Sequence, residues 1–210
     1  MQLLELEADL AKLKAMPRRQ DKVSYKRDEL LPKWMPIVRE YLQAVNTKEV
    51  TAYDHQIFAY SVVWLFDVSN YQEGIAMGLT AIKLGQPMAG KIKRNWPSFM
   101  ADTIYDWAEK QAEAGNSIEP YFSQLFKKVR RDWRLPEQIT AKYYKQAGLS
   151  LLRNLHGEVK PSECGDATVL EQADELLAKA ALIHDKVQVK TMRNKIAMRL
   201  RALADYQAQH

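Results

Sequence analysis

The chain has 210 residues, of which 47% are hydrophobic and 10% aromatic, enough for one ordinary core or two small ones. Its formal net charge of +5 is a mild basic excess, so the positions of the charges are more informative than their sum. The single cysteine, Cys164, excludes an internal disulfide and a zinc site built from thiolates. No apolar run has membrane-spanning length and no signal-peptide pattern is present, so we expect a cytosolic protein without membrane contact.

Residues 1–16 have the pattern of a helix with a two-heptad leucine seam. The seam consists of Leu3, Leu6, Leu10 and Leu13. A helix this short is marginal in water by itself, so the seam needs a partner surface. Two interpretations remain open: the helix docks on the core of its own chain, or it joins subunits of an oligomer.

A basic segment follows, in which seven cationic residues between Lys12 and Arg27 face a single acid, Asp21. The next stretch, ELLPKWMPIVREYL, contains prolines at positions 32 and 36. Because a proline biases the residue before it away from the helical conformation, we expect a helix that begins near Pro36. Its predicted buried residues are Ile37, Tyr41 and Leu42.

Residues 54–84 are predicted to form a helical hairpin at the centre of the protein. The first half is apolar on nearly every side, which indicates a buried helix, and residues 67–70 supply turn chemistry. The second half is amphipathic, and Gly74 and Gly78 would let a neighbouring backbone approach closely. Gly85 is expected to end the hairpin.

Three further helices are predicted, over residues 98–115, 117–134 and 136–155. Ser98 and Ser117 are the expected caps of the first two, and Pro136 begins the third. The side chains expected to point inward are Met100, Ile104, Trp107, Ala108, Ile118, Phe122, Leu125, Val129, Ile139, Tyr143, Ala147, Leu151 and Leu155.

Residues 156–167 have the least ordered composition and are a candidate subdomain boundary. Thr168 and Glu171 form a capping-box pair that opens a helix, and a last helix has Val189 and Ile196 at heptad-like spacing. No strand pattern occurs. We therefore predict an all-α, multi-helix bundle of helical hairpins, the last of which is partly tetratricopeptide-like. The predicted domains are 1–28 (oligomerisation and DNA), 29–155 (helical core), 156–167 (loop) and 168–210 (C-terminal hairpin).

The words ELLPKWMP, Trp64 with Asp67 and Tyr71, and the loop GQPMAGK resemble the terminase small subunit of peduovirus-type tailed bacteriophages, a family often labelled the endonuclease subunit. The resemblance covers residues 25–155. It implies a homo-oligomer, as a ring, that binds double-stranded phage DNA in the cytoplasm of the bacterial host. It further implies delivery of that DNA to a large ATPase–nuclease subunit.

Four basic clusters indicate a surface for phosphate, although any single cluster is more often a solvated face. They lie in residues 12–27, 91–94, 127–134 and 179–201, the second and third beside Trp96 and Trp133. The candidate DNA-binding residues are Arg18, Arg19, Lys22, Lys26, Arg27, Lys91, Lys93, Arg94, Lys127, Lys128, Arg130, Arg131 and Arg134.

The sequence contains no P-loop, so we do not expect an ATP-driven motor. The four histidines, His55, His156, His184 and His210, have no metal-ligand spacing, and no cofactor is expected. Asp102, Asp106 and Glu109 form one row on a helix, and such carboxylates can bind Mg²⁺ for phosphodiester hydrolysis. A solvated face is the simpler interpretation of this row. The alternatives to a DNA-binding small subunit are thus a metal-dependent endonuclease and a helical adaptor without a DNA role.

Overall fold

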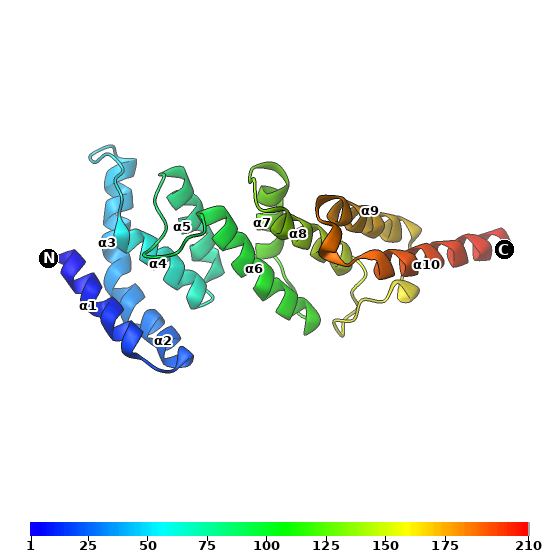
Figure 1. Ribbon diagram of the computed structural model, residues 1–210, viewed down its shortest axis with the longest axis horizontal. Helices are drawn as coiled ribbons and strands as arrows, with labels where there is room; N and C mark the ends of the chain where they lie inside the picture. Colours follow the sequence, from blue (N-terminus) through cyan, green and yellow to red (C-terminus); the bar gives the residue numbers. More distant parts are fainter. Residues whose placement is uncertain (210) are drawn as a thin grey trace. The chain divides into compact units, whose positions relative to one another are not determined.

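The computed structural model describes residues 1–209, and within this range the chain folds into helices without a β-strand (Figure 1). The predicted all-α class is confirmed. The chain divides into two compact units, Met1–Met100 and Ala101–His210, and the boundary falls inside helix α6 (Trp96–Glu113). The division predicted at residues 28, 155 and 167 follows changes in composition, and it stays a prediction.

Unit 1 is built around helix α4. Its complete helices are α1 (Gln2–Ala15), α2 (Arg19–Tyr25), the π-helical turn η1 (Lys26–Leu30), α3 (Leu31–Asn46), α4 (Gln56–Asp67) and α5 (Tyr71–Lys83). α4 packs against both α3 and α5. Phe58, Val62 and Leu65 of α4 are at most 1% exposed, as expected for a helix that is apolar on nearly every side. The prediction of a helical hairpin with a buried first helix is confirmed within unit 1.

The helix around the two prolines begins earlier than expected. The backbone is helical at Tyr25, Lys26, Leu30 and Leu31, so α2, η1 and α3 run on as one helix, and Pro36 lies inside it. The prediction of a start near Pro36 is therefore wrong. A proline costs a helix one hydrogen bond. Trp34 and Val38 have no exposed surface, so their burial outweighs this local cost.

The glycines of α5 make room for neighbouring side chains, and not for the neighbouring backbone that was expected. A Cβ atom added at Gly78 would lie 2.6 Å from the sulfur of the buried Met100, and one at Gly74 would lie 3.2 Å from the ring of Phe66. The hairpin turn is closed by Asn70, whose side chain accepts a hydrogen bond from the backbone N–H of Glu73. Gly85 follows the helix with a φ of +64°, a conformation that favours glycine.

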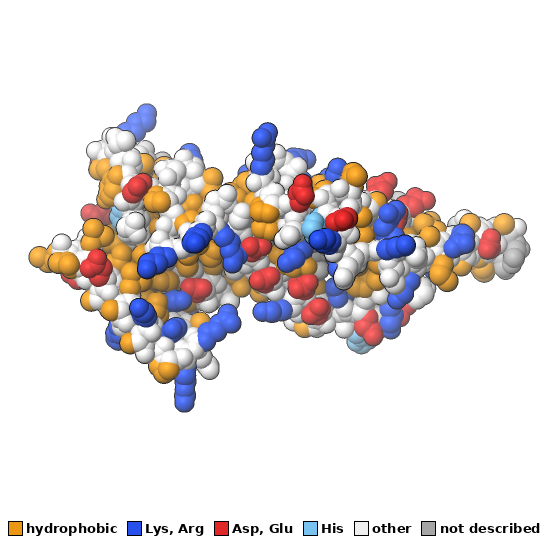
Figure 2. Space-filling model, viewed as in Figure 1, with side chains coloured by type: hydrophobic (Ala, Val, Ile, Leu, Met, Phe, Trp, Pro, Cys, Tyr) orange, Lys and Arg blue, Asp and Glu red, His pale blue; other side chains and the backbone are white. Residues whose placement is uncertain are grey.

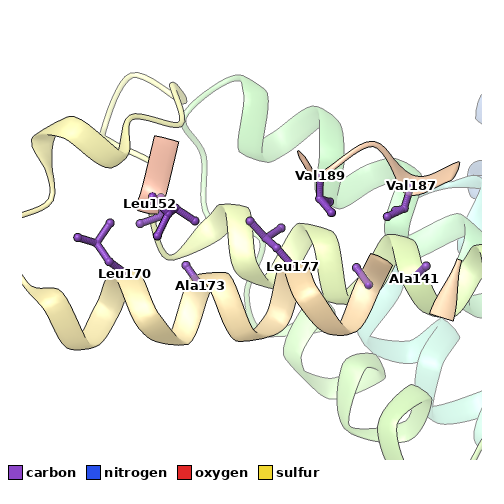
Figure 3. Packing of buried hydrophobic residues seen from close by; sticks show 9 residues of the cluster. Ala141, Leu152, Leu170, Ala173, Leu177, Val187 and Val189 are labelled. Atoms are coloured by element: carbon purple, nitrogen blue, oxygen red, sulfur yellow. The ribbon is translucent and has the colours of Figure 1, made fainter. Parts of the chain in front are cut away.

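Unit 2 has its core between three helices. It contains the rest of α6, then α7 (Tyr121–Arg131), α8 (Glu137–Ser150), the short 3₁₀ turns η2 (Pro161–Glu163) and η3 (Asp185–Val187), α9 (Ala167–Ile183) and α10 (Lys190–Gln209). Figure 3 shows side chains of the α9 face packed against residues of α8 and of the segments that precede α10. The buried cluster consists of Ala141, Leu152, Leu170, Ala173, Leu177, Ala180, Val187, Val189 and Ile196.

Two expectations about α8 are wrong. The helix ends at Ser150, so Leu151 is 42% and Leu155 is 93% exposed, and Leu152 takes the buried position instead. The predicted caps of three helices also differ from the observed ones. The side chain of Asn95 accepts the Ser98 N–H at the start of α6, and Asp166 caps α9 in place of Thr168. α7 begins at Tyr121, after Pro120 and without a side-chain cap, so Ser117 does not cap it.

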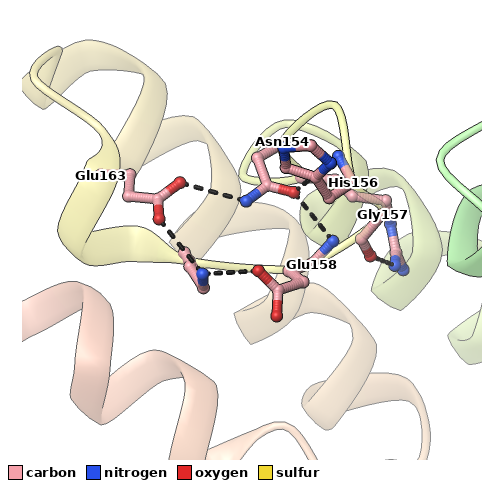
Figure 4. A network of polar contacts seen from close by, with 7 residues as sticks. Asn154, His156, Gly157, Glu158 and Glu163 are labelled. Carbon is pink, nitrogen blue, oxygen red and sulfur yellow. Dashed lines mark hydrogen bonds and ion pairs between the residues drawn. The ribbon is translucent and has the colours of Figure 1, made fainter.

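The segment predicted to be least ordered is held by a polar network (Figure 4). The carbonyl oxygen of the Asn154 side chain accepts hydrogen bonds of 3.0 Å from the N–H groups of His156 and Glu158, and its amide donates to Glu163 at 3.1 Å. Lys160 forms ion pairs with Glu158 and Glu163. Low helical propensity in this segment therefore marks a hydrogen-bonded loop and not a loose one.

Candidate nucleic-acid interface

The first group of predicted DNA contacts lies along α2 and the first residues of η1. Arg18, Arg19 and Arg27 are exposed, whereas Lys22 and Lys26 are half-buried. Lys26 donates a hydrogen bond of 2.6 Å to the carboxylate of Asp67, at the end of α4. This pair gives Asp67 a structural partner and leaves the three arginines as the outward-facing cations of the segment.

The loop between α5 and α6 presents the second group. Lys91, Lys93 and Arg94 are all exposed. The neighbouring Trp96 is only 4% exposed, and its indole donates a 2.8 Å hydrogen bond to the backbone carbonyl of Gln86. Trp96 is therefore an anchor of the loop, and its ring is not a platform on which a base could stack.

Gln86 ties the same loop to the rest of unit 1. Its side-chain oxygen accepts the backbone N–H of His55 at 2.8 Å, and its amide donates to the Tyr53 carbonyl at 2.8 Å. The amide also lies 3.3 Å from the hydroxyl of Tyr41. Because every polar atom of this buried side chain has a partner, Gln86 fixes where the basic loop leaves α5.

The end of α7 carries the third group. Lys127, Arg130, Arg131 and Arg134 are exposed, and Lys128 is half-buried. Lys128 pairs with Asp132 at 2.8 Å, one turn further along the helix. The guanidinium of Arg130 lies 5.4 Å from the centre of the Phe126 ring, a cation–π geometry that leaves its N–H donors available. Phe122, Leu125 and Val129 are buried on the opposite side of α7, as predicted.

Two arginines of the fourth cluster are engaged within unit 2, whereas its lysines, Lys179, Lys186, Lys190 and Lys195, are exposed. Arg193 forms a bidentate pair with Asp174 of α9, at 2.7 and 2.9 Å. Arg199 donates to the backbone carbonyl of Cys164. These contacts hold α10 against its neighbours, so they indicate a structural role for these two arginines. On the face in Figure 2, lysine and arginine side chains protrude from both units with carboxylates between them.

The acidic row of α6 is mostly on the surface. Asp106 and Glu109 are exposed and Asp102 is half-buried, while Ile104 and Ala108 are fully buried. Glu109 accepts a 2.7 Å hydrogen bond from the hydroxyl of Tyr105, and burial together with this carboxylate raises the pKa of that tyrosine. Nowhere in residues 1–209 do three His, Cys, Asp or Glu side chains gather in a way that could hold a metal ion.

The leucine seam of α1 faces its own chain. Leu6 is buried, and Leu10 and Leu13 are half-buried, whereas Leu3 is exposed. On the same side of α1, Asp9 accepts hydrogen bonds from Lys33 and from the indole of Trp34. The role of Asp9 could not be predicted, because nothing in the local sequence pattern connects it with residues of the next helices.

His55 and His184 have structural positions at helix ends. His55 caps α4, with its Nδ1 accepting the backbone N–H of Phe58 at 3.1 Å. His184 ends α9. His210 lies outside the described residues. In the part of the chain that the structure covers, no helix combines the length and apolar character needed to cross a membrane.

Within the described residues the chain is all-helical, and its exposed arginines lie at two helix ends and in a loop. Comparison with known proteins identifies its family. Residues 3–138 match the family described as phage small terminase subunit. The chain therefore belongs to the phage small terminase subunit family.

Two curated relatives carry terminase names. The chain is 39% identical to the "Probable terminase, endonuclease subunit" of Haemophilus phage HP1 over 201 residues, which cover 96% of this chain and 70% of that protein. It is 27% identical to the "Terminase, endonuclease subunit" of Escherichia phage P2 over 149 residues, 71% of this chain and 58% of that protein. No solved structure matches this chain.

Proposed function

We propose that the chain is the DNA-binding small subunit of a phage packaging terminase. In this proposal it acts as a homo-oligomeric ring in the cytoplasm of the bacterial host. The ring binds double-stranded phage DNA through phosphate contacts and presents it to the large ATPase–nuclease subunit. Membership of the small terminase family supports the biological setting. The exposed arginines support the proposed contacts with phosphate.

The end of α7 is the observation that carries the proposal. Its exposed cations, Lys127, Arg130, Arg131 and Arg134, outnumber the one acid of the segment, Asp132, which already pairs with Lys128. Arginine presents a planar fork of N–H donors that can grip phosphate with two hydrogen bonds. Neutralising phosphates releases condensed counterions, and this release drives binding that is independent of sequence.

Oligomerisation makes a modest contact per subunit sufficient. If each subunit neutralises two or three phosphates, the subunits of a ring bind the same DNA at high effective concentration, which raises the affinity by orders of magnitude. The salt dependence then becomes steep, because the slope of log affinity against log salt is about −0.9 for each phosphate neutralised. DNA binding in this proposal needs no cofactor.

The test is DNA binding by the double variant Arg130→Ala with Arg131→Ala, measured by fluorescence anisotropy across a salt series. We expect weaker binding to all duplex sequences alike and a flatter salt slope. The matched control is Lys128→Ala with Asp132→Ala, which removes an ion pair from the same segment without changing the net charge, and it should bind like the wild type. Unchanged binding by the arginine variant at low salt would remove this cluster from the proposal and favour an adaptor without a DNA role.

The names of both relatives favour one second candidate, a metal-dependent endonuclease. Asp102, Asp106 and Glu109 would be its carboxylates and Mg²⁺ its cofactor, because clustered carboxylates can bind Mg²⁺ and activate a water molecule. The exposure of Asp106 and Glu109 gives this candidate little geometric support. Nicking of supercoiled plasmid by the purified chain with Mg²⁺, lost in Asp102→Ala or Asp106→Ala, would establish it. Retained nicking in both variants would assign the cleavage elsewhere.

A further inference from the structure

Helix α1 has two unlike faces, and only one of them is covered by its own chain. The inner face carries Leu6, which is buried, and Asp9, which bonds to Trp34. The opposite face begins with a large apolar side chain in water, since Leu4 is 71% exposed. Figure 1 shows α1 at the margin of unit 1, and Figure 2 shows hydrophobic side chains exposed at its first turn.

The outer face has the spacing of a second coiled-coil seam. Leu4, Ala8, Ala11 and Ala15 are separated by four, three and four residues, and all four are exposed. This spacing alternates d and a positions of a heptad and places the four side chains on one side of the helix. Alanine at such positions allows a second helix to approach closely, since the distance between packed helices depends on the side chains at the contact.

Charged residues flank this seam in an order that favours one orientation of a partner helix. With Leu4 at a d position, Glu5 and Lys12 occupy e positions, and Glu7 and Lys14 occupy g positions. Each flank is therefore acidic in the first half of the helix and basic in the second. Glu7 and Lys14 are exposed and lie about 10 Å apart along the axis, seven residues at 1.5 Å each, so they cannot pair with each other.

A second copy of α1 in the antiparallel direction satisfies the exposed charges of one flank. In an antiparallel pair, e positions face e positions and g positions face g positions, so Glu7 meets Lys14 of the partner subunit. Glu5 and Lys12, on the other flank, already contact their own chain, through the ammonium of Lys33 at 3.8 Å and the ring of Tyr25 at 4.4 Å. A parallel pair would let Glu7 reach only Lys12 of the partner subunit, and it would place the two acidic halves side by side, which opposes association. The antiparallel arrangement also opposes the two helix dipoles favourably.

We propose that α1 is a twofold contact between two copies of this chain, formed by antiparallel pairing of the outer face, with Leu4 beside Ala15 of the partner subunit. This inference rests on the oligomer of the proposed function and names one of its contacts. A twofold contact closes after two copies, so a larger ring requires a second, different interface. A single helix pair buries a small area, so we expect the dissociation constant of a weak complex.

The test is sedimentation equilibrium of the full-length chain over a concentration series. Glu7→Lys and Lys14→Glu should each weaken the dimer roughly tenfold or more, because each places like charges across the contact. Glu7→Lys combined with Lys14→Glu in one chain should restore the wild-type dissociation constant, because the pair is re-formed with reversed signs. If Glu7→Lys is rescued by Lys12→Glu and not by Lys14→Glu, the helices are parallel and the proposed geometry is wrong.

The apolar part of the contact has its own variant and control. Leu4→Asp should weaken the dimer at least as much as the single charge reversals, while Leu182→Asp, at a similarly exposed leucine of α9, should leave it unchanged. Both positions lie outside the cores, so the melting temperatures should remain those of the wild type. Wild-type association in Leu4→Asp would overturn the inference. Weak DNA binding by a chain that still dimerises would instead count against the proposed function alone.

Discussion

The indole of Trp34, which has no exposed surface, donates a hydrogen bond of 2.9 Å to the carboxylate of Asp9, and this bond joins α1 to α3. The same carboxylate receives the ammonium of Lys33 at 2.8 Å and the hydroxyl of Tyr25 at 3.3 Å. One acid near the middle of α1 thus collects three donors from the helices that follow. The docking of α1 on its own chain depends on this carboxylate together with Leu6.

Replacing Asp9 with alanine should destabilise unit 1. The buried indole N–H of Trp34 would lose its acceptor, and an unsatisfied buried donor costs about 1–3 kcal/mol in the free energy of unfolding. Lys33→Ala is the control, because its side chain is 41% exposed and a surface ion pair contributes at most about 1 kcal/mol. Urea unfolding followed by tryptophan fluorescence separates the two. Equal losses of unfolding free energy in both variants would show that the hydrogen bond from Trp34 to Asp9 contributes no more than the ion pair with Lys33.

The histidine cap of α4 should make stability depend on pH. Burial lowers the pKa of His55, and its neutral Nδ1 accepts the Phe58 N–H. The unfolded chain takes up a proton as the pH falls below about 6.5, while the folded chain resists protonation. The free energy of unfolding is therefore highest above this pH and falls as the pH is lowered toward the folded-state pKa, by at most about 1.4 kcal/mol per pH unit.

Thermal melts at pH 7.5 and 5.5 measure this effect. His55→Asn retains a side chain that can cap a helix but does not titrate, so its melting temperature should change less between the two conditions. Parallel curves for the variant and the wild type would exclude His55 as the source. The rings of Tyr41 and Tyr53 lie 4.3 and 5.5 Å from the His55 ring, centre to centre, and Gln86 accepts the backbone N–H of His55.

The exposed arginines at the start of α2 should act on DNA binding and not on stability. Arg18→Ala with Arg19→Ala is expected to reduce the salt slope by about one to two, one unit for each phosphate that the variant no longer neutralises, with an unchanged melting temperature. Lys26→Ala should instead lower the melting temperature and leave the salt slope unchanged. Lys26 is held by Asp67, and its removal leaves that carboxylate without its partner. Fluorescence anisotropy measures the salt slope of each variant, and calorimetry measures its melting temperature. A stability loss in the arginine variant and a DNA-binding loss in Lys26→Ala would show that the roles are assigned wrongly.

Gly157 should tolerate no side chain. Its φ is +83°, and a Cβ atom there would collide with the backbone carbonyl of Glu113 at the end of α6. Gly157→Ala should cost about 2 kcal/mol or more, since neither the backbone nor the neighbouring carbonyl can move cheaply. Gly165→Ala is the matched control, because nothing lies within 4 Å of its added Cβ atom. Denaturant unfolding of both variants should separate them clearly.

The sequence predicted helices well where apolar residues recur regularly, as in α4, α5 and α7. It failed where tertiary contacts decide the ends. Ser98 and Asn95 are both good caps, and the earlier one is used because Trp96 must reach the Gln86 carbonyl. The apolar period continues from Ile139 to Leu155, but the turn organised by Asn154 takes the chain away from the core.

The cationic residues of the candidate interface could be predicted from the sequence, but their partners within the chain could not. Cationic clusters are visible in the sequence, and most of the named arginines are exposed. Which lysines are already engaged could not be read from it, because Lys26 and Asp67 are 41 positions apart. The burial of Trp96 was equally hidden, because a tryptophan beside lysines is as typical of a nucleic-acid surface as of a loop anchor.

The anchoring of the loop after α5 has a thermodynamic consequence for whatever meets Lys91 and Lys93. Buried Ala89, the indole of Trp96 and the amide of Gln86 hold this loop in one arrangement before any contact is made. A floppy basic loop would lose conformational freedom upon association, and this loss would subtract from the affinity. Here that loss has been incurred during folding, so the backbone that carries Lys91 and Lys93 is already ordered before any association.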